Sequence, residues 1–198
     1  MAAKDRLVRE AWTDAALTAL GEQGLAGVAV EPLARTLKVT KGSFYWHFEN
    51  RDALLQAVIE QWESQQTAAL IQAVSAIADP RERLVQLVER AHRSARGRRL
   101  TRALAAAAEH PIIGPRLRRV TERRLAYLAQ CFAALGLDGR AAKHAARVAY
   151  AAFLGLAELD ALGLGLQTQT EQRAYLDQLL VSLLPAPRPD TPASRRAR

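Results

Sequence analysis

A short stretch near the N-terminus gathers side chains that donate hydrogen bonds, and their spacing predicts that they share one short helix. Thr40, Tyr45 and His47 carry donors that suit phosphate oxygens, and Lys41 can reach a guanine edge or a phosphate. Gly42 has no side chain, so its backbone can approach a base or a phosphate closely. Donors gathered in this way indicate contact with a nucleic acid.

These side chains need a scaffold, and the surrounding stretch has the layout of a helix-turn-helix, with the sequence VEPLARTLKVTKGSFYWHFENRDALLQAV. We expect a bracing helix over residues 30–38, a turn at Val39 and Thr40 with Thr40 as N-cap, and a second helix over residues 41–47. Phe44 and Phe48, which are four residues apart, are expected to face the core together with Val39. A seven-residue helix at a charged head does not bury side chains on every side. We therefore expect the following residues to lie on or near the outer surface: Lys41, Gly42, Ser43, Tyr45, Trp46 and His47.

The next helix is expected to begin at Arg51 after an N-cap at Asn50. The amides of its first turn suit a phosphate.

At these residues the chain resembles the TetR family of bacterial transcriptional regulators, through the string L-A-x-x-L-x-V-T-K-G-S-F-Y-W-H-F-x-N-R-x-A-L-L. The resemblance is dense over residues 7–62, and the remainder matches only in helix layout and length. It implies an all-α homodimer with a three-helix DNA-binding head and a C-terminal ligand-binding and dimerisation domain. It also implies base-edge contacts by Lys41, Gly42 and Tyr45, and phosphate contacts by Thr40, Tyr45, Trp46, His47 and Arg51.

The chain departs from the family pattern at two positions of the bracing helix. Ala29 stands where the family often has Thr or Ser as N-cap, which weakens capping by about 1 kcal/mol. Pro32 offers only a ring toward DNA at its position. Neither departure alters the predicted contact surface.

Apolar residues recur at helical spacing along the whole chain, and no alternating strand pattern stands out. We therefore predict an all-α fold of about nine helices. The expected helices cover residues 4–22, 30–38, 41–47, 51–77, 81–95, 99–109, 115–135, 138–163 and 171–184. The expected domains are a helix-turn-helix DNA-binding domain over residues 1–50 and a helical ligand-binding and dimerisation domain over 51–184. A proline-rich and arginine-rich tail, 185–198, is expected to be disordered.

The net charge of +8 is not located in the predicted DNA-binding segment. Residues 1–63 hold seven lysines and arginines against nine acids, whereas residues 81–124 hold thirteen arginines against four acids. Two runs carry much of this excess: Arg93, Arg96, Arg98, Arg99 and Arg102, and then Arg116, Arg118, Arg119, Arg123 and Arg124. The runs fit a solvated surface, long-range attraction to DNA, or an anionic effector such as an acyl-CoA or a carboxylate.

The C-terminal helices offer candidates for an effector pocket and for a dimer interface. The pocket candidates are Leu100, Leu104, Glu109, His110, Tyr127, Cys131, Tyr150 and Phe153, although the aromatic members also suit a plain core. Residues 138–163 are rich in alanine, and small side chains let helices approach closely. We therefore expect a homodimer through residues 138–163 and 171–184, where the family resemblance also places the interface.

The remaining features bound the function. The N-terminus has no signal-peptide pattern, no apolar run is long enough to span a membrane, and Cys131 has no partner for an internal disulfide, so we expect a cytoplasmic protein. The four histidines show no metal-ligand spacing, and we expect no metal and no cofactor.

The favoured function is a ligand-responsive repressor that binds a palindromic operator as a dimer and is released by a small-molecule effector. An activator would leave the same sequence signature. The alternative is an all-α enzyme or ligand carrier with a vestigial head, but no nucleophile–base pair or phosphate loop supports an enzyme. A gel-shift experiment with DNA discriminates between the two.

Overall fold

The computed structural model describes residues 2–184, with side chains from residue 8 onward, and all regular elements in this range are helical. The tail predicted over 185–198 lies outside the described residues. The elements are α1 (Ala2–Gln23), η1 (Gly24–Gly27), α2 (Val30–Leu37), α3 (Lys41–Tyr45), α4 (Arg51–Glu63), η2 (Ser64–Ala68), α5 (Ala69–Ser75), α6 (Pro80–Arg93), α7 (Ala95–Ala106), α8 (Ile113–Ala134), α9 (Gly139–Ala161) and α10 (Gln169–Leu183). Across this part of the chain, no helix combines the length and apolar character that crossing a membrane requires.

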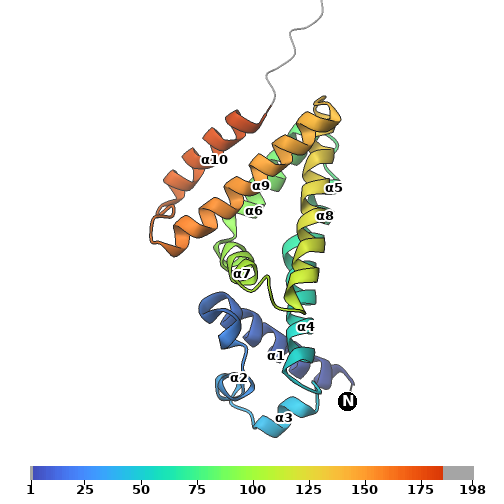
Figure 1. Ribbon diagram of the computed structural model, residues 1–198, viewed down its shortest axis with the longest axis vertical. Helices are drawn as coiled ribbons and strands as arrows, with labels where there is room; N and C mark the ends of the chain where they lie inside the picture. Colours follow the sequence, from blue (N-terminus) through green and yellow to red (C-terminus); the bar gives the residue numbers. More distant parts are fainter. Residues whose placement is uncertain (1, 185–198) are drawn as a thin grey trace, which may run out of the picture.

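The first three helices form a head at one end of the molecule, and α3 lies at the end farthest from α9 and α10 (Figure 1). Trp12 of α1 and Phe44 of α3 are fully buried and meet edge to face with ring centroids 5.3 Å apart. Phe48 stacks on Phe44 at 5.5 Å, so both phenylalanines face the core as predicted. This aromatic cluster fixes α3 against the head.

The helix that leaves the head is long, as predicted, but it contains one π-helical turn. α4, η2 and α5 follow one another without leaving helical backbone, because the residues at each junction are right-handed helical. Counted as one helix, they bring the described residues to the predicted nine. The turn η2 inserts an extra residue into the ladder of hydrogen bonds, a feature that often marks functional sites.

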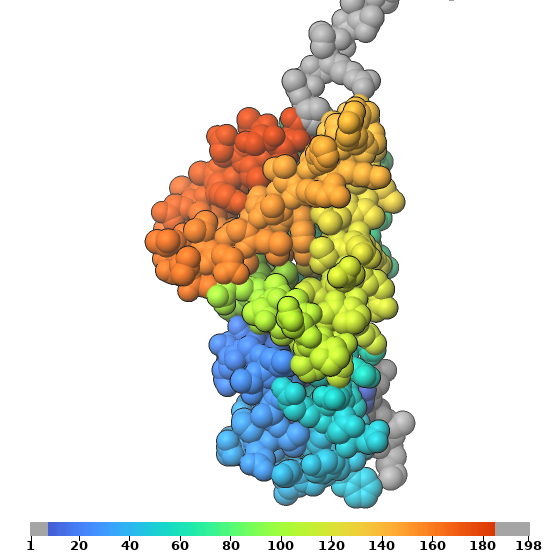
Figure 2. All heavy atoms as spheres, in the orientation of Figure 1, coloured from blue at the N-terminus to red at the C-terminus, as the bar shows by residue number. Residues whose placement is uncertain are grey.

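A second core lies among α5, α6, α8, α9 and α10. Ala142, Ala146 and Ala149 of α9 are buried there, where small side chains bring α9 close to α8. α10 packs against α6 and α9, and Figure 2 shows α9 and α10 sharing one face at the end opposite the head. Part of the alanine-rich surface is therefore used within the chain.

The head is not packed separately from the rest of the chain. Its core continues into α4 through Leu54 and Trp62, into α7 through Leu100 and Leu104, and into α8 through Val120. The domain division at residue 50 stays a prediction.

The prediction that Val39 faces the core is wrong, since its side chain is 38% exposed. α2 ends at Lys38, which adopts a left-handed conformation with φ 56°, and the Val39 N–H bonds to the Ala34 carbonyl at 3.0 Å. This ending turns the chain outward, and Leu33 and Ala34 supply the buried contacts of α2 instead. The second helix of the motif ends at Tyr45 and is therefore two residues shorter than the predicted range of 41–47.

We predict that Phe44→Ala lowers the free energy of unfolding by about 3–5 kcal/mol, because it empties the centre of the head core. Trp46→Ala, two residues away, removes a larger side chain that is 86% exposed, and should change stability by no more than about 0.5 kcal/mol. Urea unfolding followed by circular dichroism measures both values. Equal costs would show that α3 is not fixed through Phe44.

Candidate nucleic-acid interface and ligand cavity

The outer side of α3 and the residue after it present large side chains to solvent. Tyr45 is 57% exposed and Trp46 is 86% exposed. Phe44, on the inner side of α3, is fully buried. Lys41 and Gly42 are also exposed, and Ser43 and His47 are half-buried. The structure therefore leaves six of the predicted residues fully or partly exposed on the head.

Thr40 caps α3 as predicted, because its Oγ1 accepts a hydrogen bond from the Ser43 N–H at 3.3 Å. The Thr40 hydroxyl proton stays available for an external acceptor. A methyl group added at Gly42 would meet only Thr40 Oγ1, at 3.7 Å. Internal packing therefore does not require glycine at this position, and a close approach of DNA to Gly42 stays a prediction.

Lys41 is paired with an acidic residue that sequence reasoning missed. Its Nζ donates to Glu31 Oε1 of α2 at 2.9 Å, and both side chains are more than half exposed. Because the two groups share a hydrogen bond and carry opposite charges, the pKa of Glu31 is lowered and the pKa of Lys41 is raised. The residue predicted to reach a base edge is thus partly neutralised in the DNA-free protein.

The guanidinium of Arg51 points into the protein. Its Nε donates to the Val28 carbonyl at 2.6 Å and its Nη2 to the Leu25 carbonyl at 2.9 Å, which joins the start of α4 to the connection before α2. Asn50 caps α4 as predicted by accepting from the Ala53 N–H at 2.9 Å. A phosphate contact at Arg51 therefore stays a prediction for its backbone amide, with the side chain serving as a brace.

The two arginine runs are used mainly within the chain. Arg116 pairs with Glu60 at 2.8 Å, and Arg119 and Arg123 pair with Glu63 at 3.9 and 3.5 Å, so α8 is joined to α4 at successive turns. The first run makes similar pairs, namely Arg93 with Glu89, Arg98 with Asp160 and Arg102 with Glu158. These pairs neutralise much of the charge that made the runs conspicuous.

A cavity of about 270 Å³ lies between η2, α5, α6, α8 and α9, and also touches the start of α7. Three of the pocket candidates, Tyr127, Tyr150 and Phe153, line it. The other five lie elsewhere: Leu100 and Leu104 in the head core, Cys131 in the second core, and Glu109 and His110 between α7 and α8.

Several polar residues of the cavity wall were missed as pocket residues, among them Gln66, His92, Thr101 and Arg124. They come from four separate elements that only the tertiary structure brings together. Arg124 was visible in the sequence as part of an arginine run, but nothing there distinguished it from its neighbours.

His92 is buried in the cavity wall and is held in one tautomer. Its Nδ1 lies 2.8 Å from the Val88 carbonyl oxygen and must donate to it, because that oxygen can only accept. Burial lowers the pKa of the imidazole, so the ring is neutral at pH 7. Its Nε2 and the Thr101 Oγ1 are buried without a hydrogen-bond partner among the described residues.

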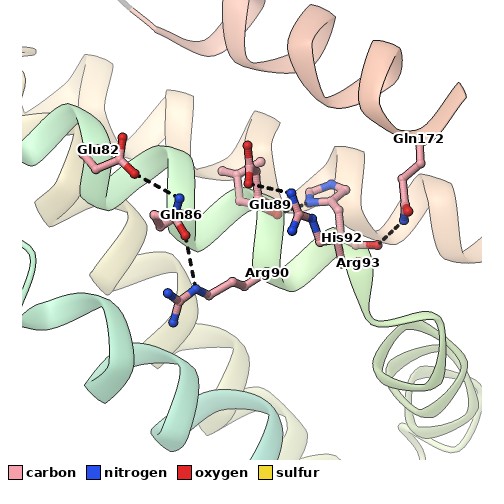
Figure 3. A network of polar contacts seen from close by, with 8 residues as sticks. Glu82, Gln86, Glu89, Arg90, His92, Arg93 and Gln172 are labelled. Atoms are coloured by element: carbon pink, nitrogen blue, oxygen red, sulfur yellow. Dashed lines mark hydrogen bonds and ion pairs between the residues drawn. The ribbon is translucent and has the colours of Figure 1, made fainter. Parts of the chain in front are cut away.

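The carbonyl of His92 joins three helices. Arg98 of α7 donates to it and also to Asp160 Oδ2 of α9 at 2.6 Å. Gln172 of α10 donates to the same carbonyl at 3.3 Å, as Figure 3 shows. The cavity wall is therefore fixed to both C-terminal helices.

Comparison with known families and proteins agrees with this geometry. Residues 13–58 match the family described as bacterial regulatory proteins, tetR family. The tetracycline repressor protein class D of Escherichia coli is 43% identical over 53 residues, which cover 27% of this chain and 24% of that protein. The HTH-type transcriptional regulator BetI of Rhizobium meliloti is 34% identical over 80 residues, which cover 40% of this chain and 39% of the regulator. The chain thus matches well under half the length of these curated relatives.

Solved structures match over most of the chain. A TetR-family member from Streptomyces coelicolor A3 has a TM-score of 0.64 and 25% identity, covering 90% of this chain and 98% of that one. A transcriptional regulator from Saccharomonospora viridis in complex with choline has a TM-score of 0.75 and 17% identity, covering 89% and 96%. These matches confirm the resemblance to the TetR family and its all-α fold with an N-terminal helix-turn-helix.

The Glu31–Lys41 pair gives a prediction for DNA binding. Glu31→Gln should raise affinity for mixed-sequence duplex DNA, because in non-specific complexes it frees Lys41 for a phosphate and removes a charge that repels the backbone. The plot of log K against log salt should steepen by about 0.9, the value for one added phosphate contact. Fluorescence anisotropy with a mixed-sequence duplex at several salt concentrations measures both changes.

Glu22→Gln, which removes the same charge from the exposed end of α1, is the matched control and should leave the slope unchanged. A loss of affinity confined to one base pair in Glu31→Gln would show instead that Glu31 reads a cytosine edge.

Proposed function

Because residues 13–58 match the TetR family and the described fold is shared with TetR-family structures, we propose that the chain is a transcriptional repressor that binds a palindromic operator as a homodimer. A small-molecule effector then releases it from DNA. The observation that carries the proposal is the outer surface of α3, which exposes Lys41, Tyr45 and Trp46 on a helix fixed from beneath by Phe44.

In this proposal α3 lies in the major groove of DNA. Lys41, Gly42 and Tyr45 contact base edges, while Thr40, Tyr45, Trp46 and His47 hold phosphates. Arg51 contributes its backbone amide at the start of α4, and its side chain keeps α4 in position. Residues 1–50 form the DNA-binding domain, and residues 51–184 form the ligand-binding and dimerisation domain.

The homodimer forms through residues 138–163 and 171–184. α9 leaves an apolar stripe uncovered, in which Val148, Leu159 and Leu162 are 59%, 43% and 70% exposed. Gly155 lies within this stripe and a methyl group there would meet nothing within 4 Å, so a second helix can approach closely. Val181 of α10, in the second predicted interface segment, is also apolar and 74% exposed.

The effector binds in the cavity, and α4 carries its effect to the head. Gln66 and Thr67 of η2 line the cavity, and η2 directly continues α4, whose Glu60 and Glu63 are paired to α8. A ligand releases DNA only if it binds more tightly to a dimer with an unsuitable spacing of the two heads. The choline of the Saccharomonospora viridis regulator does not define this chain's effector, because a likeness at 17% identity supports the fold alone.

The alternative of an all-α enzyme or carrier has less support. The described residues contain no group of three or more His, Cys, Asp or Glu side chains placed to hold a metal ion. The buried guanidinium of Arg98 is used to join α7 to α9 through Asp160.

A gel shift with the DNA upstream of the chain's own gene, and with palindromes selected from a random library, tests the repressor. We expect specific retardation, and its absence on every duplex would overturn the proposal. Tyr45→Phe should weaken binding to all sequences by roughly 1 kcal/mol if the hydroxyl holds a phosphate. A loss at a single base pair would show that Tyr45 reads a base.

The dimer interface gives a separate prediction. Val148→Glu places a charge in the middle of the apolar stripe of α9 and should raise the dimer dissociation constant by roughly a hundredfold. Ala73→Glu adds the same charge at an exposed position of α5 and should leave the dimer intact. Analytical ultracentrifugation distinguishes the two variants, and unchanged circular dichroism confirms that both are folded. A dimeric Val148→Glu variant would exclude this interface.

A further inference from the structure

The charged groups around the cavity all have one sign. Among the described residues that line it, Arg90 and Arg124 are cationic and none is an aspartate or a glutamate. His92 adds no charge, since burial keeps its ring neutral at pH 7. A space lined by two cations and no acid favours an anion over a neutral molecule or a cation.

Arg124 lies deeper than Arg90 and has no carboxylate within 4 Å among the described residues. The guanidinium stacks over the Trp62 ring at 4.8 Å, and donates from Nε to Thr67 Oγ1 at 2.9 Å and from Nη2 to the Gln66 carbonyl at 3.3 Å. Tyr150 of the cavity wall is a further hydrogen-bonding partner, so these contacts leave part of the five N–H donors of the guanidinium for a ligand.

Tyr150 of α9 and, more weakly, Glu63 favour the charged guanidinium, but Tyr150 is not an acid at pH 7 and Glu63 is already paired with Arg119 and Arg123. Burial disfavours the charge and lowers the pKa of Arg124. The cation is therefore incompletely compensated in the ligand-free protein, and an anion in the cavity would compensate it.

Arg90 is exposed at the edge of the same cavity, and its hydrogen-bond partner is an uncharged side chain. Its Nε donates to Gln86 Oε1 at 3.3 Å, and Gln86 in turn donates to Glu82 at 2.9 Å, so a row of side chains along α6 holds it in place (Figure 3). Figure 3 also shows Arg90 directed away from Gln172 and α10. A second cation at the edge attracts an anion toward the cavity without needing to contact it.

The rest of the wall is mainly apolar. Five apolar side chains from α5, α6, α8 and α9 line the cavity together with the two arginines: Leu70, Leu87, Val88, Leu128 and Phe153. A volume of about 270 Å³ suits a small metabolite and is below the roughly 300–1,000 Å³ of pockets for drug-sized ligands. An acyl-CoA with its nucleotide does not fit within this space.

We propose that the cavity binds a small amphipathic carboxylate, whose carboxylate pairs with Arg124 and whose aliphatic or aromatic body lies against the apolar wall. This inference rests on the proposed function only in treating the cavity as the effector site. A carboxylate that draws the guanidinium into the cavity weakens its bonds to Thr67 and the Gln66 carbonyl. Binding therefore changes the contacts of η2, the turn that continues α4 from the DNA-binding head.

Isothermal titration calorimetry on the full chain without DNA tests the class of ligand. The probes are two matched series, hexanoate with hexanamide and hexylammonium, and phenylacetate with phenylacetamide and phenethylammonium. We expect at least one carboxylate to bind roughly ten- to a hundredfold more tightly than its amide, because a charge-assisted pair is lost in the amide. The ammonium compounds should bind most weakly.

Variants assign this preference to Arg124. Arg124→Gln should remove the difference between carboxylate and amide, whereas Arg124→Lys should keep most of it. Arg118→Gln, which removes an exposed charge from the same helix outside the cavity, should behave as the unchanged protein. Because the carboxylate and amide are also compared in the unchanged protein, the test stands even if Arg124→Gln fails to fold.

Two results would overturn the inference: amides or ammonium compounds that bind as well as the carboxylates, or no carboxylate binding at millimolar concentration. A gel shift with the same probes separates this failure from failure of the proposed function. Carboxylate binding that leaves DNA affinity unchanged would contradict effector release and keep the ligand class. Release of DNA by a neutral or cationic compound would contradict the proposal that the ligand is a carboxylate. It would remain consistent with the proposal that the chain is an effector-released repressor.

Discussion

A continuous helix that is buried at both ends constrains the whole molecule. α4 is packed into the head core through Leu54 and Trp62, and its continuation through η2 forms a wall of the cavity. Since a helix is stiff over this length, the two ends cannot change position independently. The ion pairs of Glu60 and Glu63 with α8, and the Arg124 contacts with Trp62 and η2, hold the helix along its side. The π-helical turn η2 is the place where this helix departs from regular geometry, and the cavity residues Gln66 and Thr67 lie within it.

The same constraint explains how so short a helix can present a binding surface. α3 has five residues, and a helix of that length has no stability of its own in water. Its geometry comes from Thr40, which satisfies an amide at its start, and from Phe44, which is enclosed by Trp12 and Phe48. Arg51 then joins the start of α4 to the carbonyls before α2. The positions of α1, α2 and α3 are therefore fixed relative to one another and to α4. Tyr45 and Trp46 can be exposed because the core of the head is filled by other residues.

The features that could be predicted from the sequence are those set by neighbouring residues. Caps at Thr40 and Asn50 and the inward placement of Phe44 depend on positions within one helical turn, and the structure shows each of them. The side-chain direction of Arg51 and the pair between Lys41 and Glu31 depend on how separate helices meet, and local spacing contains no information about that. The same reason explains why Tyr127, Tyr150 and Phe153 were found as cavity residues while Arg124 was not, because an aromatic pattern marks an interior but a charged run suggests a surface. Val39 shows that an apolar residue in a turn follows the backbone conformation of its neighbour rather than its own hydrophobicity.

Charge has a different role in this protein from the one that its total suggests. The head is slightly acidic, and Lys41 is paired, so long-range attraction contributes little to a contact between α3 and DNA. In the proposed complex, close hydrogen bonds and shape must then supply most of the binding, and the position of the two heads in the dimer becomes decisive. The arginines of the second run lie on α8, where most of them fix α4 and one faces the cavity. In our proposal an anion in the cavity acts through Arg124 on η2, and through η2 on the helix that carries the head.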